Sequence, residues 1–594
     1  MFSLIELIKD KCQQAVVMAY PELSAETVEV TATSQANGAQ FGDYQFNSAM
    51  RFSKILRQPP REIANNIVNC LQKIQSTTHS FDELEFSSIQ VAGPGFINFI
   101  LADNFVEKNL ELFLKSGRFS WNQNKLEKSS VKRVVVDFSS PNIAKEMHVG
   151  HLRSTIIGDC IARMLEFLEY DVLRINHVGD WGTQFGMLIA YLKIHNKLVD
   201  SLTIKDLVDC YKQAKNIFDT DPVFKTAAQQ EVVKLQQGAE ESLLIWKKIC
   251  EISIKDYKII YKLLDIKITD RGESFYNQML KQVVEDFAVN NLLQESNGAK
   301  CVYLEGFVGR DNQPLPLIIQ KSDGGYNYAT TDLAAIKHRI NQENADWLIY
   351  VTDSGQALHF SMIFAAAKQV GYLKNQQIKV DHVPFGLVLR NDGKKFKTRE
   401  GDTEKLKDLI NNAILKAKRL LLERNPELLD NELNKLAEIM GVNAIKYADL
   451  SNNRNSDYVF DYDKMLQFNG NTAAFLSYAY VRINSIKNKI FIDSDDIENL
   501  ILNSQIKLTD PHERNLAFRI CKFNDVVVNA VDELLPNRLT DYLYLLAEEF
   551  HLFFHNCRVI GSEFQNNRLL LCEAVAKIMK VGFNILGLQI IDKM

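Results

Sequence analysis

The fold is decided by residues 139–151, which read SSPNIAKEMHVGH. The residues before this stretch, 131–138, include three consecutive valines, a pattern typical of a strand buried on both faces. The residues after it place apolar side chains at helical spacing, so we expect a helix that begins near His148. The two histidines of the stretch therefore lie where a buried strand passes into a helix.

A helix start of this kind favours a nucleotide phosphate. Its first backbone N–H groups lack partners and the helix dipole is positive there, so both attract an anion. His148 and His151 add imidazole donors, and Gly150, which has no side chain, lets a flat base approach the backbone. This chemistry suits a nucleoside triphosphate that reacts at its α-phosphate. The His-x-Gly-His motif alone is equally compatible with two histidines bonded to local backbone.

The composition limits the possible functions. At 594 residues the chain is too long for one hydrophobic core, and its formal net charge of −5 is unlike that of proteins that coat nucleic acid indiscriminately. Any RNA must then be bound by local patches and shape. Nine cysteines without a Cys-x-x-Cys pair argue against a cysteine-based zinc site and indicate reduced thiols in a cytoplasmic protein. No apolar run is long enough to predict a membrane span.

Residues 138–159, together with DWGTQFG at 180–186, resemble the signature region of class I aminoacyl-tRNA synthetases. The resemblance is most specific to arginyl-tRNA synthetases and extends over essentially the whole chain. It implies an ATP-dependent ligase that joins L-arginine to its cognate tRNA through an arginyl-adenylate, with release of pyrophosphate and AMP. ATP is then a substrate, Mg²⁺ is its phosphate counter-ion with no dedicated protein ligands, and a monomer is the family expectation.

Two other functions remain compatible with the motif. A different class I synthetase or a small nucleotidyltransferase could carry it, although the latter gives no reason for two extra terminal domains. A synthetase-like protein that only binds RNA is the non-enzymatic alternative, and the presence of both histidines and of acidic residues in the expected pocket disfavours it.

Patterns of helix and strand predict an α/β protein whose catalytic domain is Rossmann-like and doubly wound, with a helical insertion at about 188–264. The N-terminal domain alternates helical and strand-like segments, as in an α+β domain, and the C-terminal anticodon-binding domain is all-α. The expected parts are an additional tRNA-binding domain at 1–112, a linker at 113–130, the catalytic domain at 131–402, a helical connector at 403–460 and the anticodon-binding domain at 461–594.

Five residues are candidates for binding arginine. The resemblance assigns Asn142, Glu273 in a Gly-Glu-Ser context, and Gln356 after the strand predicted at 347–351. Tyr328 and Asp332 are four residues apart, so on one helix face a phenol and a carboxylate could hold a guanidinium. From spacing alone, Asp332 is more readily explained as an acid at a helix N-terminus, and the resemblance assigns it to arginine recognition.

The resemblance also assigns the ATP side. His148 and His151 would stabilise the transition state, Gly150 would lie against ATP, and His359 would lie toward it. The basic loop NDGKKFKTREG at 391–401 corresponds to the second class I signature, Lys-Met-Ser-Lys-Ser, but Thr398 stands where the second lysine is expected.

Two lysines, Lys145 and Lys397, are the catalytic candidates to supply the missing positive charge, and Lys395 is assigned to ATP binding. We favour Lys145, because it is tethered beside the phosphate-binding helix start and requires no shift of the loop. Arginyl-tRNA synthetases also keep a lysine at that place.

Four residues are candidates for contacts with tRNA. Phe96 and Asn98 resemble motifs of the additional N-terminal domain, and an exposed aromatic ring and amide suit an unstacked loop base. Turn chemistry with an aromatic core explains the same residues without RNA. Tyr478 and Arg482 lie in residues 470–482, which resemble the opening of the anticodon-binding domain.

Overall fold

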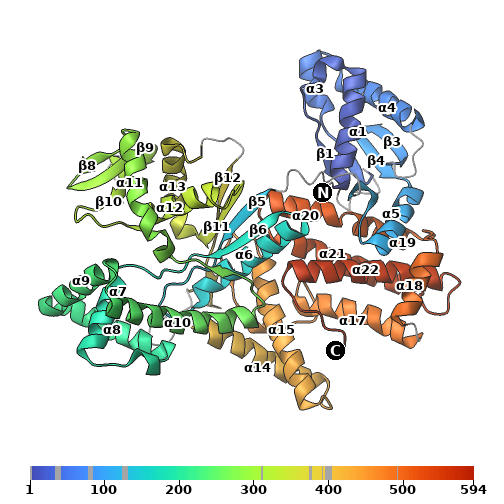
Figure 1. Cartoon of the computed structure of the whole chain (residues 1–594). Coiled ribbons are helices and arrows are strands. Elements are labelled where there is room, and N and C mark those ends of the chain that lie inside the picture. Colours follow the sequence, from blue (N-terminus) through green and yellow to red (C-terminus); the bar gives the residue numbers. More distant parts are fainter. Residues whose placement is uncertain are drawn as a thin grey trace.

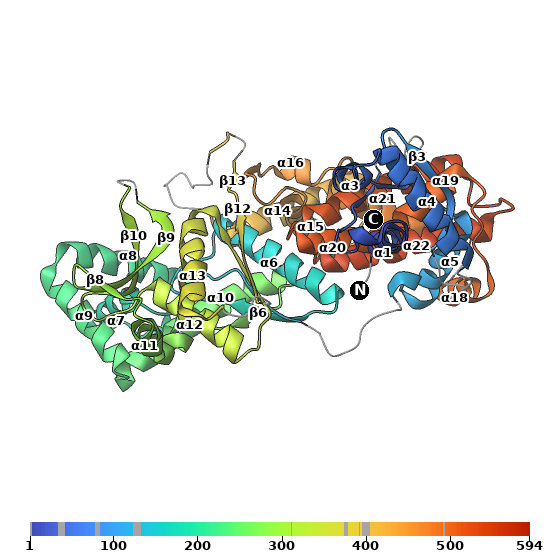
Figure 2. The same ribbon diagram turned by 90° about the horizontal axis from the view of Figure 1, so that it is seen from above.

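The chain is described from a computed structural model (Figure 1). The described residues are 3–33, 42–77, 84–122, 132–309, 312–373, 378–390, 392–394, 404–490 and 493–593. The catalytic sheet lies at the centre of the molecule. A helical insertion and a small antiparallel sheet lie to one side of it, and the two terminal domains lie to the other (Figures 1 and 2).

The N-terminal domain is a four-stranded antiparallel sheet with helices packed against it, as expected for an α+β domain. The strand order is β1-β2-β4-β3. Strands β3 and β4 form a hairpin that turns at residues 93–95, where Gly93 and Gly95 have positive φ. The elements are α1 Leu4–Ala19, β1 Val30–Ala32, β2 Tyr44–Phe46, α3 Ala49–Leu56, α4 Pro60–Thr77, β3 Phe86–Ala92 and β4 Phe96–Leu101.

The start of the expected linker is structured instead. Helix α5 (Asp103–Ser116) continues past residue 113, and a 3₁₀ turn follows at Ser120–Asn122. The ring of Phe119 stacks on Phe113 and on Trp121, with 4.8 Å between centroids in each pair, and all three side chains are buried. The prediction of a linker was therefore wrong for these residues, because three aromatic rings close a small core there. Residues 123–130 lie outside the described residues.

The catalytic domain contains the predicted doubly wound parallel sheet, in the order β12-β11-β5-β6-β7. Its strands are β5 Arg133–Asp137, β6 Asp171–Asn176, β7 Thr269–Asp270, β11 Trp347–Asp353 and β12 Lys379–Phe385. Strand β5 has β6 on one side and β11 on the other. The chain adds the β6 side first and the β11 side later, so the strand order reverses beside β5. Ligands bind at such switch points, beyond the carboxyl ends of the strands. Residues 139–151 leave the sheet at that point and lead into α6 (Val149–Phe167).

Two insertions flank this sheet. The predicted helical insertion comprises α7 Thr183–Ile194, α8 Ile204–Thr220, α9 Pro222–Gln236 and α10 Glu240–Leu263. A second insertion, an antiparallel sheet in the order β10-β9-β8, was not predicted. Its strands are β8 Gln294–Ser296, β9 Ala299–Val308 and β10 Pro314–Gln320. The other helices of the catalytic domain are α11 Leu280–Val289, α12 Tyr328–Asn341 and α13 Ala357–Val370.

The rest of the chain is nearly all helical, as predicted, apart from the short strand β14 (Tyr458–Val459), which pairs with β13 (Val388–Leu389). Among the described residues, no helix combines the length and the apolar character that crossing a membrane requires. The helices are α14 Leu406–Arg424, α15 Asp430–Leu450, α16 Tyr462–Met465, α17 Ala473–Lys489, α18 Ser494–Asn503, α19 Pro511–Cys521, α20 Phe523–Asp532, α21 Asn537–Asn556 and α22 Gln565–Ile585.

The N-terminal domain is docked on α19 and α20 by charged groups. Arg514 of α19 pairs with Asp43 at 2.9 Å and with Asp103 at 2.8 Å. The hydroxyl of Tyr44 donates to the buried carboxylate of Asp525 on α20. These bonds join the first and last domains of the chain directly, although the bonded residues are more than 400 positions apart in sequence.

Candidate active site

The turn that carries residues 139–151 is held in an unusual backbone conformation. Ser139, Ser140 and Ala144 have φ of 69°, 47° and 59°, in the left-handed region that side chains other than glycine rarely adopt. Each such residue lowers the stability by roughly 1–3 kcal/mol, so the conformation persists only where surrounding contacts hold it. Here the N–H of Ser139 donates to Ser154 of α6 at 2.9 Å, and the Ser140 hydroxyl donates to Asp137 of β5 at 3.1 Å. The turn is therefore fixed before any substrate binds.

Helix α10 of the insertion supports the same turn from the other side. The hydroxyl of Tyr257 lies 2.6 Å from the carbonyl oxygen of Asn142 and 2.8 Å from that of Lys145. The Ala144 N–H donates to the Ser253 hydroxyl at 3.0 Å. The insertion thus fixes the backbone beneath two of the predicted site residues.

The two histidines cap the start of α6 reciprocally. Nδ1 of His148 accepts a hydrogen bond from the Gly150 N–H at 3.0 Å, and Nδ1 of His151 accepts one from the His148 N–H at 3.1 Å. The ring centroids are 4.1 Å apart. A Cβ at Gly150 would lie 2.7 Å from the His148 ring, so only glycine fits this cap. The structure therefore brings together three of the five residues predicted to bind ATP.

Both imidazoles are electrically neutral in this setting. Burial lowers the pKa of His151 to about 3, with a smaller contribution from its neighbour His148. The pKa of His148 is lowered by burial and by the nearby charge of Lys145. Because each Nδ1 accepts a hydrogen bond, the single ring proton of each neutral histidine resides on Nε2. The pair therefore offers two uncharged N–H donors beside the positive end of a helix dipole.

Residues 404–406, which follow the basic loop in sequence, are bonded to this turn. The Val149 N–H donates to the Glu404 carbonyl at 3.1 Å, and the Leu406 N–H donates to the Met147 carbonyl at 3.0 Å. Lys405 pairs with Glu146 at 2.8 Å. The predicted lysines Lys395 and Lys397, with Thr398, lie outside the described residues.

An acidic cluster of Asp180, Glu273 and Asp332, in the predicted arginine pocket, lies beyond the carboxyl ends of the strands. Asp180 accepts from the Ser274 N–H at 2.8 Å and from its hydroxyl at 2.6 Å, and a side chain at Gly272 would collide with the Asp180 carboxylate. The pKa of Glu273 is raised to about 8 by burial first and then by the negative charges of Asp332 and Asp180. Carboxyl groups that repel one another in this way are suited to a cationic ligand.

Helix α12 places the two predicted recognition residues on one face. It begins at Tyr328 and therefore includes Asp332, as the four-residue spacing requires. Tyr328 is 66% exposed and accessible to a ligand. Nε2 of His359, at the start of α13, is 2.6 Å from Oδ2 of Asp332, so the structure connects His359 with the acidic pocket. The prediction that His359 lies toward ATP is untested.

The two other predicted arginine ligands follow neighbouring strands of the parallel sheet, Asn142 after β5 and Gln356 after β11. Asn142 is exposed and forms an isolated bridge with Gly179, which precedes Asp180. Gln356 is exposed in the 3₁₀ turn that follows β11. Lys145 is exposed on the turn, close enough for its charge to act on both histidines.

The tRNA candidates differ in accessibility. Asn98 is 8% exposed and its Oδ1 accepts from Gln45 at 2.8 Å, so the expectation of an exposed amide was wrong: the cross-strand partner holds it in the sheet. Phe96 is half-buried. Tyr478 is 42% exposed beside His551, and the Arg482 guanidinium carbon lies 4.3 Å from the centroid of the Phe554 ring.

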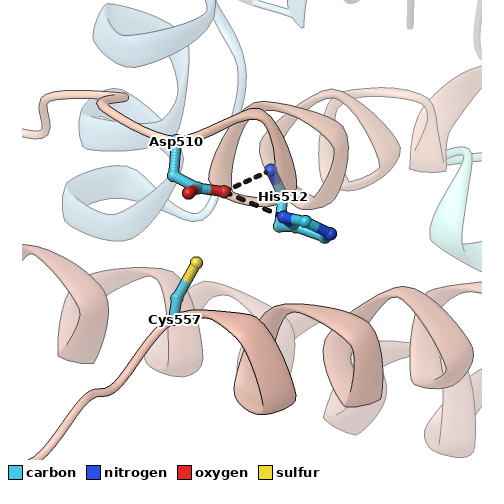
Figure 3. A group of neighbouring side chains, drawn as sticks. All are labelled: Asp510, His512 and Cys557. Atoms are coloured by element: carbon cyan, nitrogen blue, oxygen red, sulfur yellow. Dashed lines mark hydrogen bonds and ion pairs between the residues drawn. The ribbon is translucent and has the colours of Figure 1, made fainter.

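One group of metal-binding side chain types occurs in the described part of the chain, away from this site (Figure 3). It comprises Asp510, His512 and Cys557, which face one another. Asp510 caps α19, and its Oδ1 accepts from the His512 N–H at 2.8 Å and lies 2.9 Å from the His512 ring Nδ1. Burial, with the neighbouring Asp510 charge, raises the pKa of the Cys557 thiol to about 12. These bonds are those of a helix N-cap, so no bound cation is needed to explain why the side chains lie together.

The parallel sheet, its switch point and two neutral histidines at a helix start define the class: a class I aminoacyl-tRNA synthetase. Family models match three parts of the chain. They are described as "tRNA synthetases class I (R), catalytic domain" at residues 117–462, "DALR anticodon binding domain" at 476–594 and "Arginyl tRNA synthetase N terminal domain" at 3–101.

Full-length relatives agree with these matches. The chain is 52% identical to the arginine–tRNA ligase of Protochlamydia amoebophila and 47% identical to that of Cyanothece sp., over the whole of both chains in each case. It is similar to the solved arginyl-tRNA synthetase of Plasmodium falciparum, with a TM-score of 0.85 and 36% identity over the whole of both chains. The Thermus thermophilus arginyl-tRNA synthetase, with a TM-score of 0.76 and 20% identity, shares the fold over 99% of this chain and all of that one. The chain belongs to the arginyl-tRNA synthetase family.

Proposed function

We propose that the chain attaches L-arginine to its cognate tRNA in two steps. The arginine carboxylate attacks the α-phosphate of ATP and pyrophosphate leaves. A terminal ribose hydroxyl of the tRNA then attacks the carbonyl carbon of the arginyl-adenylate and releases AMP. The observation that carries this proposal is the position of an acidic pocket, suited to a cationic amino acid, beside a neutral helix start suited to phosphate.

The acidic pocket would bind the arginine side chain. Asp332 and Tyr328 would hold the guanidinium, the first by charge-assisted hydrogen bonds and the second through its ring face. Glu273 would supply the further negative charge, and Asn142 and Gln356 would bind the polar groups of the amino acid. Asp180 fixes the segment 272–274, which carries Glu273, through its two bonds to Ser274.

The helix start would bind ATP. The Nε2–H groups of His148 and His151 would donate to phosphate oxygens as negative charge builds up during transfer, and Gly150 would lie against the nucleotide. Lys145 would neutralise the leaving pyrophosphate, with Lys395 and Lys397 on the loop as further cations. His359 would act where the ATP and arginine sites meet.

Mg²⁺ would accompany ATP as the counter-ion of its phosphates. Imidazole and ammonium groups surround the helix start, and neither is a ligand that Mg²⁺ prefers, so phosphate oxygens and water would hold the ion. We also propose that the protein is a cytoplasmic monomer. The nine described cysteines, all buried and free of disulfides, are compatible with a reducing compartment.

The tRNA would be bound by both terminal domains. We propose the additional tRNA-binding domain at 1–112, the catalytic domain at 131–402, a connector at 403–460 and the anticodon-binding domain at 461–594. Tyr478 and Arg482 offer accessible contacts for anticodon bases, and Phe96, beside the Gln45–Asn98 pair, offers one for a loop base.

A charging assay tests the proposed function. The purified chain is incubated with ATP, total tRNA and each of the twenty amino acids in turn. We expect only arginine to be esterified, and only to arginine tRNA. Charging of a different amino acid would contradict arginine as the substrate, and binding of tRNA without any charging would support the non-enzymatic alternative.

A further inference from the structure

Helix α8 of the insertion reaches the proposed active site, although its sequence alone indicated no role there. It begins at the N-cap Thr203, which forms a capping box with Asp206, and it buries Leu207, Cys210 and Ala214 against the rest of the insertion. Tyr211 lies four residues after Leu207, at the edge of this buried stripe. A side chain in that position is anchored at its base while its ring remains partly accessible.

The Tyr211 ring is close to both halves of the proposed site. Nζ of Lys145 lies 5.8 Å from the centroid of the ring, within the range of a cation–aromatic contact. On the arginine side, the pKa of Tyr328 is raised by burial, then by Glu273 and by Tyr211, which shows that the two phenols are near one another. One side chain of α8 thus adjoins the exposed lysine of the phosphate side and the exposed tyrosine of the arginine side.

We propose that Tyr211 is a positioning residue for adenylate formation, whose ring holds the Lys145 ammonium beside the phosphate-binding helix start. This inference rests on the proposed function, because it gives Lys145 its role in neutralising pyrophosphate. Lys145 is otherwise exposed on a long, flexible side chain, and a flexible cation neutralises a leaving group less effectively than one held in place. The phenol of Tyr328 is also near the Tyr211 ring, so the contact between Tyr211 and Lys145 adjoins the proposed arginine pocket.

The test is a double-mutant cycle on the rate of adenylate formation, measured in single turnovers with saturating arginine, ATP and tRNA. The variants are Tyr211→Leu, Tyr211→Phe, Lys145→Ala and the double variant Lys145→Ala/Tyr211→Leu. We expect Tyr211→Leu to slow the step about fivefold, the scale of a partly exposed cation–aromatic contact. Tyr211→Phe keeps the ring and should remain within about twofold of the wild type. The double variant should be no slower than Lys145→Ala alone, because the ring then has no lysine to hold.

Helix α8 supplies a matched control. Phe218 lies seven residues further along, and Nζ of Lys215 and of Lys225 each lies 5.6 Å from its ring. Phe218→Leu removes the same kind of contact from the same helix, so it should reproduce any general loss of helix stability and leave the adenylation rate unchanged.

Three results would overturn the proposal: equal slowing by Tyr211→Phe and Tyr211→Leu, equal slowing by Phe218→Leu, or a double variant slower than Lys145→Ala by the full factor that Tyr211→Leu causes alone. These failures are distinguishable from failure of the proposed function. The latter would appear as a wild-type chain that charges no arginine, before any variant is compared.

Discussion

The proposed ATP side and the proposed arginine side of the site are built on opposite physical principles. At the ATP side the strained backbone is held by hydrogen bonds, and the two histidines are neutral and accept hydrogen bonds at Nδ1. At the proposed arginine side, carboxyl groups lie close together, and burial together with their repulsion raises the pKa of Glu273. Geometry is thus prepared in advance where charge develops during the reaction, whereas crowded carboxyl groups, one of them held protonated, favour a ligand that is itself a cation.

The largest expected effect is on the arginine side. Asp332→Asn removes one negative charge and keeps the shape of the side chain, so it should weaken arginine binding by roughly 2–5 kcal/mol, the usual loss when a buried charge pair is broken. ATP affinity should change little. Calorimetric titration of each ligand separately checks this, and equal losses for both ligands would contradict the division of the site.

A comparable effect is expected for the lysine of the ATP side. Lys145→Ala should reduce the single-turnover rate of adenylation by about 10²–10³-fold, the scale for removing one donor to a developing charge. Lys397→Ala, in the basic loop, should cost less in the same assay. Folding of both variants is checked by thermal melting. If Lys397→Ala proves more damaging, the loop supplies the principal cation and Lys145 does not.

A smaller effect tests whether the turn is prepared by the insertion. Tyr257→Phe removes only the hydroxyl that bonds to the Asn142 and Lys145 carbonyls. Loss of one such bond costs about 0.5–1.5 kcal/mol, so we expect adenylation to slow by a factor of about 2–10. Tyr191→Phe, a hydroxyl deletion elsewhere in the insertion, is the matched control and should leave the rate unchanged. An unaltered rate in Tyr257→Phe would show that the turn holds its shape without α10.

The local chemistry of the site could be predicted from sequence where it is contiguous. The strand, turn and helix around residues 139–151 and the helix that carries Tyr328 and Asp332 follow from short-range patterns, and the structure confirms both. Other contacts of the site form only in the folded chain. Tyr211 and Tyr257 contact the turn or its side chains once α8 and α10 pack near it, and Asp180 contacts the segment 272–274 in the same way. No periodicity within the sequence encodes this packing.

Other features were missed for separate physical reasons. The stacked rings of Phe113, Phe119 and Trp121 stand in a polar segment, which concealed a small aromatic core. In the sheet β8–β10, β8 is a three-residue polar segment and β10 contains two prolines, features more typical of loops than of strands. Asn98 resembled an exposed amide because its partner Gln45 lies on another strand, far away in the sequence.

The contrast between the two sides is tested most directly by measuring the affinities of the unmodified protein for arginine and for ATP at pH 7 and at pH 8. Because the pKa of Glu273 is raised to about 8, its carboxyl group is mostly protonated at pH 7 in the protein without ligand. A bound cation must expel that proton. Arginine affinity should therefore rise about fivefold from pH 7 to pH 8, with release of a proton on binding. ATP affinity should stay the same, because both histidines are already neutral throughout this range. A flat pH profile for arginine, or an ATP affinity that changes as much as that of arginine, would contradict the account.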